Sequence, residues 1–505
     1  MKLTNPKQQR NKMKVRRARK AVAMTTNQVP RSNPSSNFFD PSCSVFPKNS
    51  VSQTLRKPLP HQAEALIYAA GKKQIALYME MRLGKTLVTI RWAKEHKGRK
   101  LVVAPVTALA DWERELVSEG VPLTRIHWLT HNVKNKEETV NKYPQDWFLV
   151  NYQSTPKAPL IPDGWETIIV DECTALRNPK AKFTKYAIRT LNDIPNRAIL
   201  SGLPAPEASM DYFSQFCFLH GSFLGQGNFW AFRKKHFHAG WSQWALIPNK
   251  GTLEMIKQEV HRLAFVRTRR QCKIGPKKVY QRRVIDMNPE QKKLYAQVEG
   301  KFDYKKNGEW ITTKYSPVKF SWMSQIAGGF YPGKEEPSLR ALSDTKFKEL
   351  LYLLQGELQN EKVVVWFRFN VELYQAQLFL NSKGIKTKSV YGAVERKERA
   401  EASQEFKKDP KIQVMLAQVK CAKFSMDWSV ASTAIYFSNS YAMEDRAQSE
   451  DRIIHPLNTG TALYIDLISR GTIDEDVVDI LRDKNVNSRM FMRRLVERWE
   501  AKCKK

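Results

Sequence analysis

A phosphate-binding loop is the first chemical signal in the chain. The apolar run Gln74–Tyr78 leads into residues 79–86, MEMRLGKT, and the residues after them are typical of a helix. In such a turn, backbone N–H groups around Gly84 and the helix N-terminus bind phosphates, Lys85 neutralises the outer phosphates and the Thr86 hydroxyl can hold Mg²⁺. The loop alone is a moderate signal, because Gly-Lys-Thr also occurs by chance and the usual first glycine is missing.

Two carboxylates follow a later strand. The apolar run Thr167–Val170 ends in Asp171 and Glu172, which predicts both acids at the carboxyl edge of the same sheet, beside the phosphate loop. Asp171 can hold the Mg²⁺, and Glu172 can orient and deprotonate an attacking water. An isolated Asp-Glu pair could simply begin a helix. The order of strand, loop and helix around both motifs instead favours ATP hydrolysis.

The elements that must position these residues alternate between short apolar strands and amphipathic helices, which predicts an α/β fold with parallel sheets wrapped by helices. Two similar series of strands imply two tandem lobes. The first series comprises Gln74–Tyr78, Lys100–Pro105, Trp147–Asn151, Thr167–Asp171 and Arg197–Leu200. The second comprises Lys362–Phe367, Thr387–Tyr391, Gln413–Ala417, Thr433–Ser438 and Ala462–Leu467, with helices at Val371–Lys383 and Ala393–Lys407.

Residues 205–345 interrupt this alternation, because they are aromatic, basic and poor in strand signals. We therefore expect a helical insertion followed by a connection between the lobes. The expected organisation is a disordered basic arm and linker over 1–55, a first lobe over 56–285 with its insertion from about 205, an interlobe connection over 286–345, a second lobe over 346–485 and a basic C-terminal helix over 486–505.

Charge points to a polyanionic partner. The 505 residues carry a formal net charge of +34, which attracts nucleic acid and is typical of proteins held to it by counterion release. Residues 1–20 hold nine Lys/Arg and no acid, which favours nonspecific nucleic-acid contact by the arm over a merely solvated tail. The six cysteines are far apart, which predicts free thiols and no structural metal.

No apolar run approaches the roughly 20 residues that span a bilayer, and the N-terminus lacks the apolar block of a secretory signal. We expect no membrane contact and a cytoplasmic location.

A second candidate nucleic-acid surface lies between Phe229 and Trp244. This segment contains Arg233, Lys234 and Lys235, and aromatic rings beside cations suit stacking on unpaired bases. An insertion that packs its own aromatic core is an equally good interpretation. In the C-terminal helix, by contrast, the apolar stripe that includes Leu495 favours core packing.

The ordered set of motifs resembles the superfamily 2 helicases, and within them the Swi/Snf-type branch that includes compact bacteriophage helicases, over residues 56–480. In the first lobe, residues 59–62 (LPHQ) look like the segment whose glutamine, Gln62, reads adenine. Residues 102–105 with the helix around Trp112 are similar to a nucleic-acid-contacting motif, which implies a contact by Pro105. Residues 200–204 (LSGLP) match the motif that couples hydrolysis to strand movement, which implies a nucleic-acid contact by Ser201.

Later motifs narrow the resemblance. Residues 265–270 (FVRTRR) and 288–295 (NPEQKKLY) look like the connection specific to the Swi/Snf branch. Residues 448–452 (QSEDR) resemble the last motif, which implies that Arg452 reaches from the second lobe to the γ-phosphate; a surface ion pair with its acidic neighbours is the alternative. The resemblance implies two RecA-like lobes, ATP and Mg²⁺ as cofactors, and DNA, single-stranded, duplex or branched, as the partner, with RNA left open.

Three departures from the family pattern stand out. His455 occupies the place of a second arginine, and we keep it as a candidate nucleotide-binding residue although neutral imidazole cannot replace a guanidinium. Residues 421–428 (CAKFSMDW) lack the usual glycines, and Arg82 replaces a glycine in the phosphate loop. We expect an ATP-dependent DNA translocase or helicase of reduced ATPase rate. The alternative is a nucleic-acid binding or annealing protein that keeps the fold with weak or lost ATP turnover.

Overall fold

The computed structural model describes residues 56–483 and Leu495, except 130–135, 156–163, 206–208, 240–245, 302, 307–308, 313–315, 334–340 and 424–425. The expected basic arm, residues 1–55, and the expected C-terminal helix, apart from Leu495, lie outside the described residues. Within the described part of the chain, no helix is long and apolar enough to cross a membrane.

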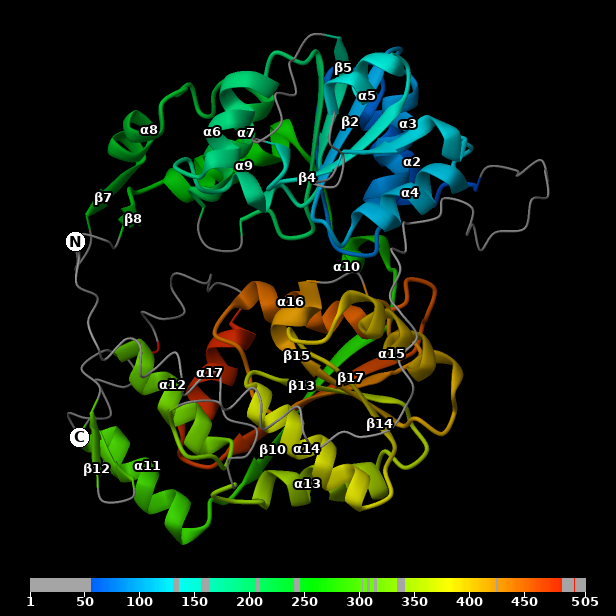
Figure 1. Ribbon diagram of the computed structural model, residues 1–505. Helices are drawn as coiled ribbons and strands as arrows, with labels where there is room; N and C mark the ends of the chain where they lie inside the picture. The colour runs from blue at the N-terminus through cyan, green and yellow to red at the C-terminus, as the bar shows by residue number, and fades with distance from the viewer. Residues whose placement is uncertain are drawn as a thin grey trace, which may run out of the picture. The chain divides into compact units, whose positions relative to one another are not determined.

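The first lobe is built on a parallel sheet of seven strands in the order β3-β4-β2-β5-β6-β1-β9. Three of these strands, β2, β4 and β5, are labelled in Figure 1. The strands are β1 (Gln74–Met79), β2 (Arg99–Ala104), β3 (Ile126–Trp128), β4 (Trp147–Asn151), β5 (Trp165–Val170), β6 (Asn196–Leu200) and β9 (Phe265–Arg267). The five strands expected from the apolar runs are present within two residues of their predicted bounds. β3 and β9, with three residues each, were not predicted.

Helices cover both faces of this sheet, which explains why its inner strands are apolar on both sides. On one face, α2 (Pro60–Ala69), α3 (Lys85–Lys94) and α4 (Leu109–Ser118) contribute side chains such as Trp92 and Trp112 to the core. The other core includes residues of α5 (Lys136–Lys142), α6 (Lys182–Tyr186), α7 (Asp211–His220) and α9 (Thr252–Leu263). The loops at the carboxyl ends of β1, β5 and β6 are thereby held on a rigid base.

The second lobe has a parallel sheet of six strands in the order β10-β17-β16-β13-β15-β14. The strands are β10 (Lys277–Ile285), β13 (Val363–Phe367), β14 (Thr387–Val390), β15 (Val414–Gln418), β16 (Thr433–Tyr436) and β17 (Thr461–Ser469). All five predicted strands are present. β10 was not predicted, and it pairs with β17 along its whole length. The chain therefore passes to the second sheet before residue 277, ahead of the boundary expected at 285.

The helices of the second lobe also lie on both faces of its sheet. α13 (Thr345–Gln355) and α14 (Asn370–Ser382) pack on one side, while α15 (Arg396–Lys408) contributes Phe406 to the core on the other. α16 (Met443–Glu450) follows β16. A separate helical core joins α11 (Pro289–Lys301), α12 (Ser316–Ala327), α17 (Ile473–Arg482) and Leu495, so Leu495 packs in a core as its apolar stripe predicted.

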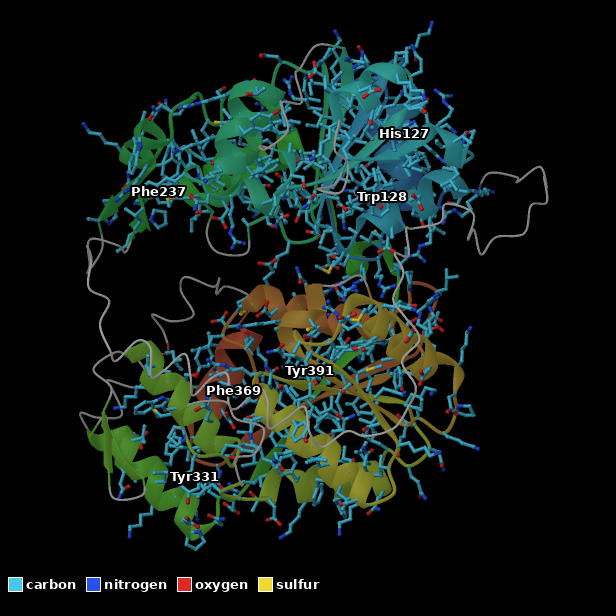
Figure 2. All side chains as sticks on the ribbon, in the orientation of Figure 1. His127, Trp128, Phe237, Tyr331, Phe369 and Tyr391 are labelled. Atoms are coloured by element: carbon cyan, nitrogen blue, oxygen red, sulfur yellow. The ribbon has the colours of Figure 1, made fainter. Side chains whose placement is uncertain are left out.

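The segment expected to be a helical insertion and a connection contains strands as well as helices. Besides β9 and β10, it holds α8 (Phe229–His236), α10 (Arg269–Cys272), the antiparallel pair β7 (Phe237–Ala239) and β8 (Leu246–Pro248), and the hairpin of β11 (Asp303–Lys306) and β12 (Glu309–Thr312). Phe232 is fully buried against Phe213, Phe223 and Phe237, the last of which is labelled in Figure 2. An aromatic core inside the insertion, one of the two interpretations, is therefore present.

Candidate active site

The phosphate loop connects β1 to α3, as the sequence predicted. Gly84 caps α3 in a left-handed conformation, φ +75°, and a Cβ there would lie 2.1 Å from the Gln62 Nε2 atom. Only glycine therefore fits this position without displacing Gln62. The Lys85 ammonium donates to the backbone oxygen of Met79 at 2.9 Å, so the lysine folds back over its own loop.

Gln62 and His61 brace this loop from α2. The Gln62 amide donates to the Leu83 backbone oxygen at 3.2 Å, and its own carbonyl oxygen accepts the Leu59 N–H at 2.9 Å. The Nε2 atom of His61 lies 2.9 Å from the same Leu83 oxygen. Gln62 is thus a buried support of the phosphate loop, and its recognition of adenine stays a prediction.

Asp171 lies directly after β5 and is held by two hydrogen bonds. Its Oδ2 atom accepts the indole N–H of Trp112 at 2.8 Å, and its Oδ1 atom accepts the backbone N–H of Glu172 at 3.0 Å. Burial raises the pKa of Asp171 despite these bonds and the nearby Lys85 charge. A divalent cation in the pocket would favour the ionised carboxylate over the protonated form.

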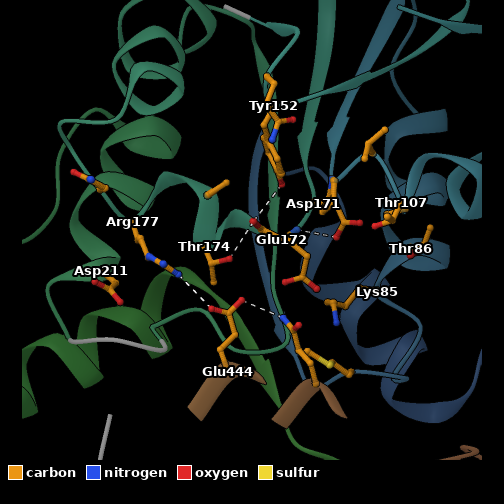
Figure 3. A pocket seen from close by; sticks show the side chains of 18 of the residues that line it. Lys85, Thr86, Thr107, Tyr152, Asp171, Glu172, Thr174, Arg177, Asp211 and Glu444 are labelled. Carbon is orange, nitrogen blue, oxygen red and sulfur yellow. Dashed lines mark hydrogen bonds and ion pairs between the residues drawn. The ribbon is translucent and has the colours of Figure 1, made fainter. Parts of the chain in front are cut away.

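Glu172 follows with a left-handed backbone, φ +50°, which is uncommon outside glycine. Burial, and then the charge of Asp171, raises the pKa of the Glu172 carboxyl to about 7. A carboxyl with this pKa can accept a proton from water near neutral pH. Figure 3 shows Lys85, Thr86, Asp171 and Glu172 around one pocket.

Ser201 lies beside Glu172, at the end of β6. The sequence placed it at nucleic acid, but it is fully buried at the end of β6, and its hydroxyl lies 3.5 Å from the Glu172 Oε2 atom, to which it donates. The reason is topological, because β6 lies between β5 and β1 in the sheet. Ser201 contacts the carboxylate of Glu172, and its contact with nucleic acid stays a prediction.

Arg452 brings the second lobe into the pocket. Its guanidinium lines the same pocket as Lys85 and Glu172, and its Nη1 atom donates to the Met426 backbone oxygen at 3.1 Å. Burial first, and then the charge of Arg82, lowers the pKa of Arg452 to about 10.

The acidic neighbours of Arg452 have other partners, which argues against the alternative of a surface ion pair. Asp451 pairs with Arg269 at 2.6 Å, and Glu450 pairs with Arg446 at 2.8 Å. His455 is not among the described residues that line the pocket, and its Nδ1 atom accepts the Leu457 backbone N–H at 3.2 Å. Among the described residues that line the pocket, Arg452 is therefore the only basic residue from the second lobe.

The donor set fits a Mg²⁺-bound nucleoside triphosphate. The loop offers helix N-terminal N–H groups, Lys85 offers a cation for phosphate, and Thr86 and Asp171 offer the hard oxygen ligands that Mg²⁺ prefers. When bound, Mg²⁺ would neutralise charge on the phosphate oxygens. Glu172 and Arg452 are then placed for the two remaining tasks, which are to take a proton from water and to stabilise charge on the phosphate.

The other residues predicted at nucleic acid include two that line the pocket, Pro105 and Arg233. Pro105 is half-buried and lines the pocket beside α4. Lys234 and Lys235 are exposed on α8, whereas Arg233 lies over the ring of Trp230, with its guanidinium carbon 5.5 Å from the centroid. Trp230 itself is 53% exposed, and the Lys180 ammonium lies 5.0 Å from its ring centroid. The ring of Trp230 on α8 is thus exposed and lies near the cations of Lys180 and Arg233.

Two contacts between residues that line the pocket were missed by sequence reasoning. Trp112 was assigned to a nucleic-acid motif, but it is buried and orients Asp171. Arg177 of the first lobe pairs with Glu444 of the second at 3.3 Å (Figure 3). No local pattern identifies either contact, because the partners are far apart in the chain.

Comparison with known proteins agrees with this geometry. The model of the SNF2-related domain matches residues 61–326, and that of the helicase conserved C-terminal domain matches residues 345–456. YwqA of Bacillus subtilis (strain 168), whose name ascribes to it an ATP-dependent helicase/translocase activity, is 22% identical over 80% of this chain and 45% of its own length. The Drosophila melanogaster SWI/SNF-related matrix-associated actin-dependent regulator of chromatin subfamily A-like protein 1 is 22% identical over 87% of this chain and 57% of its own length.

Among solved structures, the Sulfolobus solfataricus SWI2/SNF2 ATPase core in complex with dsDNA is 19% identical, covers 86% of this chain and 92% of that chain, and has a TM-score of 0.39. The chain spans about half the length of the curated relatives it matches. The SNF2-related model alone covers more than half of the chain. The chain therefore belongs to the SNF2-related family within helicase superfamily 2, and it carries the ATPase core of that family.

Proposed function

We propose that this chain hydrolyses ATP in order to move along or remodel DNA. The observation that carries the proposal is the position of Arg452, which reaches from the second lobe into the pocket that holds Lys85, Asp171 and Glu172 of the first lobe. A site that takes residues from both lobes links hydrolysis to their relative movement. Such a link is what a motor on a polymer requires.

Each residue of the pocket has a separate part in the proposed reaction. Lys85 and the loop N–H groups bind the outer phosphates, while Asp171, fixed by Trp112, and Thr86 hold Mg²⁺. Glu172 orients a water molecule and accepts its proton. Arg452 stabilises negative charge on the phosphate, which it can do only while the second lobe is in place.

DNA is the polymer that the charge and the family favour. The chain carries a net charge of +34, and the end of α8 offers exposed cations around Trp230. The relatives described above come from a bacterium and an insect, and neither supports the bacteriophage origin that the resemblance suggested. A role in replication, recombination or repair, and the choice among single-stranded, duplex and branched DNA, remain part of the proposal.

One observation favours the second candidate, a DNA-binding or annealing protein with little ATP turnover. Residue 455 is a histidine where the resemblance implies a second arginine, and it is not among the described residues that line the pocket. Strand annealing that survives Glu172→Gln unchanged, together with no measurable phosphate release by the parent protein, would support this candidate.

The decisive experiment measures phosphate release by the full chain with single-stranded, duplex, forked and four-way DNA and with RNA. We expect stimulation by at least one DNA form and loss of that stimulation in Lys85→Ala. Displacement of a triplex-forming strand would then report movement along the duplex. A parent protein that shows no DNA-stimulated release, and that cannot be told apart from Lys85→Ala, would refute the motor.

A further inference from the structure

Arg82 is an unusual residue for the phosphate loop. Its backbone is left-handed, with φ +68°, a conformation that glycine adopts freely and that side chains with a Cβ rarely adopt. Backbone strain of this kind is maintained where the surrounding structure holds it, and it is concentrated at functional sites. The chain therefore keeps a long cationic side chain at a position where glycine would be unstrained.

The Arg82 side chain lies in the active-site pocket. It lines the pocket together with Lys85, Glu172 and Arg452, and only 25% of it is exposed. Its Nη2 atom donates to the Asp427 Oδ1 atom of the second lobe at 3.0 Å. Asp427 has a second partner, because its Oδ2 atom accepts the Lys407 ammonium at 2.9 Å. Asp427 would thus remain paired if Arg82 turned away from it.

Arg82 and Arg452 bring two guanidinium groups into one pocket. The charge of Arg82 contributes to the lowered pKa of Arg452, so the two groups are close enough to repel each other. The Nε atom of Arg452 is buried and has no hydrogen-bond partner among the described residues. Neighbouring cations with an unused buried donor indicate the place of an anion with several oxygens.

We propose that Arg82 is a second phosphate-binding arginine, supplied by the phosphate loop itself in the place of the arginine that the chain lacks at His455. The assignment rests on the proposed function, because it presupposes that the pocket binds a nucleoside triphosphate. A planar guanidinium can form paired hydrogen bonds with phosphate oxygens, which a neutral imidazole cannot. Because Arg82 belongs to the first lobe, one of the two guanidinium groups can bind phosphate before the second lobe brings Arg452 into place.

The competing role for Arg82 is to tie the two lobes together through Asp427. The two roles predict opposite effects of Asp427→Asn. If Arg82 binds phosphate, Asp427 competes with the nucleotide for it, so removing the carboxylate charge leaves nucleotide affinity unchanged or raises it. If the ion pair itself is what matters, Asp427→Asn and Arg82→Gly have the same effect.

The test is the equilibrium dissociation constant of a fluorescent, non-hydrolysable ATP analogue and of ADP, measured with Mg²⁺ on the full chain. We expect Arg82→Gly to weaken the triphosphate by about tenfold and ADP by less, and Arg82→Lys to retain part of the affinity. Arg262→Gln, at an exposed arginine of the first lobe that pairs with Glu259 and is not among the described residues lining the pocket, is the control and should bind as the parent does. Melting temperatures within about 3 °C of the parent verify folding.

Triphosphate affinity of Arg82→Gly equal to that of the parent would overturn the assignment, and so would an equal loss in Asp427→Asn. Lys85→Ala separates this failure from failure of the proposed function. If Lys85→Ala loses affinity while Arg82→Gly does not, only the role of Arg82 is wrong. If the parent itself does not bind the analogue, the nucleotide site is wrong, and this inference falls with it.

Discussion

The two lobes share a fold but contribute unequally to the active site. The first lobe supplies a phosphate loop braced by Gln62, a carboxylate fixed by Trp112 and a carboxyl, Glu172, tuned by burial. The second lobe supplies Arg452, whose guanidinium donates to the Met426 backbone oxygen. In the proposed function, the first lobe therefore binds the nucleotide, whereas the step that depends on the position of the second lobe requires Arg452.

Two buried glutamates extend this comparison. Burial raises the pKa of Glu172 in the first lobe and of Glu372 in the second lobe to about 7 in each case. Glu172 lies in the pocket beside Asp171, whereas Glu372 accepts the Ser438 hydroxyl inside the second lobe. Burial therefore raises the pKa both of a carboxyl proposed to be catalytic, Glu172, and of one that lies inside the second lobe, Glu372. Burial and pKa alone do not identify a catalytic group.

The largest expected effect is that of Glu172→Gln. The amide cannot accept a proton, so DNA-stimulated phosphate release should fall by about 10²–10⁴-fold while ATP binding persists. Glu444→Gln is the matched control, because Glu444 lies in the same pocket but comes from the second lobe and pairs with Arg177. Comparable losses of phosphate release in both variants would contradict the proposal that the two lobes have different parts in hydrolysis.

Trp112→Phe, also in the first lobe, should have a smaller effect on phosphate release. It keeps an aromatic side chain at this buried position but removes the N–H that donates to the Asp171 Oδ2 atom, a bond to a charged group worth about 1.5–3 kcal/mol. We expect the Mg²⁺ concentration for half-maximal phosphate release to rise about tenfold. Trp128→Phe makes the same chemical change at an indole that donates to Glu113 and should leave the Mg²⁺ requirement unaltered. Equal Mg²⁺ dependence in the two variants would contradict the role given to Trp112.

Trp230→Ala tests whether the insertion of the first lobe contacts nucleic acid. Stacking on one base contributes about 1–3 kcal/mol, so affinity for single-stranded DNA should fall about fivefold or more, with little change in melting temperature because Trp230 is half exposed. Tyr352→Ala removes a ring that is 64% exposed on α13 and serves as the control. Unchanged DNA affinity in Trp230→Ala would leave α8 as a packing element only.

Glu372→Gln should have the smallest effect on turnover and should act on stability instead. Glu372 has a pKa of about 7 in the folded protein and 4.5 as its ordinary value. Its contribution to stability is thus full below about pH 4.5 and is lost as the pH rises toward 7. Between pH 5 and 7.5 the parent should lose about 2 kcal/mol relative to Glu372→Gln, seen as a falling difference in melting temperature.

Glu361→Gln, at an exposed position of the same lobe, is the control for this pH dependence. A constant difference in melting temperature between the parent and Glu372→Gln across that range would show that Glu372 is ionised in the folded protein.

The strands around the site could be predicted because they are continuous apolar runs that end in polar motifs. β1 and β5 are buried almost throughout, and both are followed directly by the residues that form the pocket. β10 gave no such signal, because it lies at an edge of the second sheet and most of its side chains are exposed or half-exposed. β9 has only three residues, too few for any periodicity to be recognised.

Tertiary contacts explain the remaining differences. The motif around Ser201 was recognised, but its burial depends on the place of β6 between β5 and β1, which strand order in the chain does not reveal. Trp112 reaches Asp171 across 59 residues. Arg82 was noticed only as a departure from a glycine, and its place beside Arg452 required both lobes to be present.

In the proposed mechanism, the second lobe triggers hydrolysis of a nucleotide that the first lobe binds. The most direct test is the rate of phosphate release by Arg452→Ala at saturating ATP and DNA, with the dissociation constant for ATP measured on the same protein. We predict a rate at least about a hundredfold below that of the parent, because an arginine at the transferred phosphate contributes about 10³-fold or more, with affinity changed only a few-fold. Phosphate release by Arg452→Ala at the rate of the parent would contradict this mechanism.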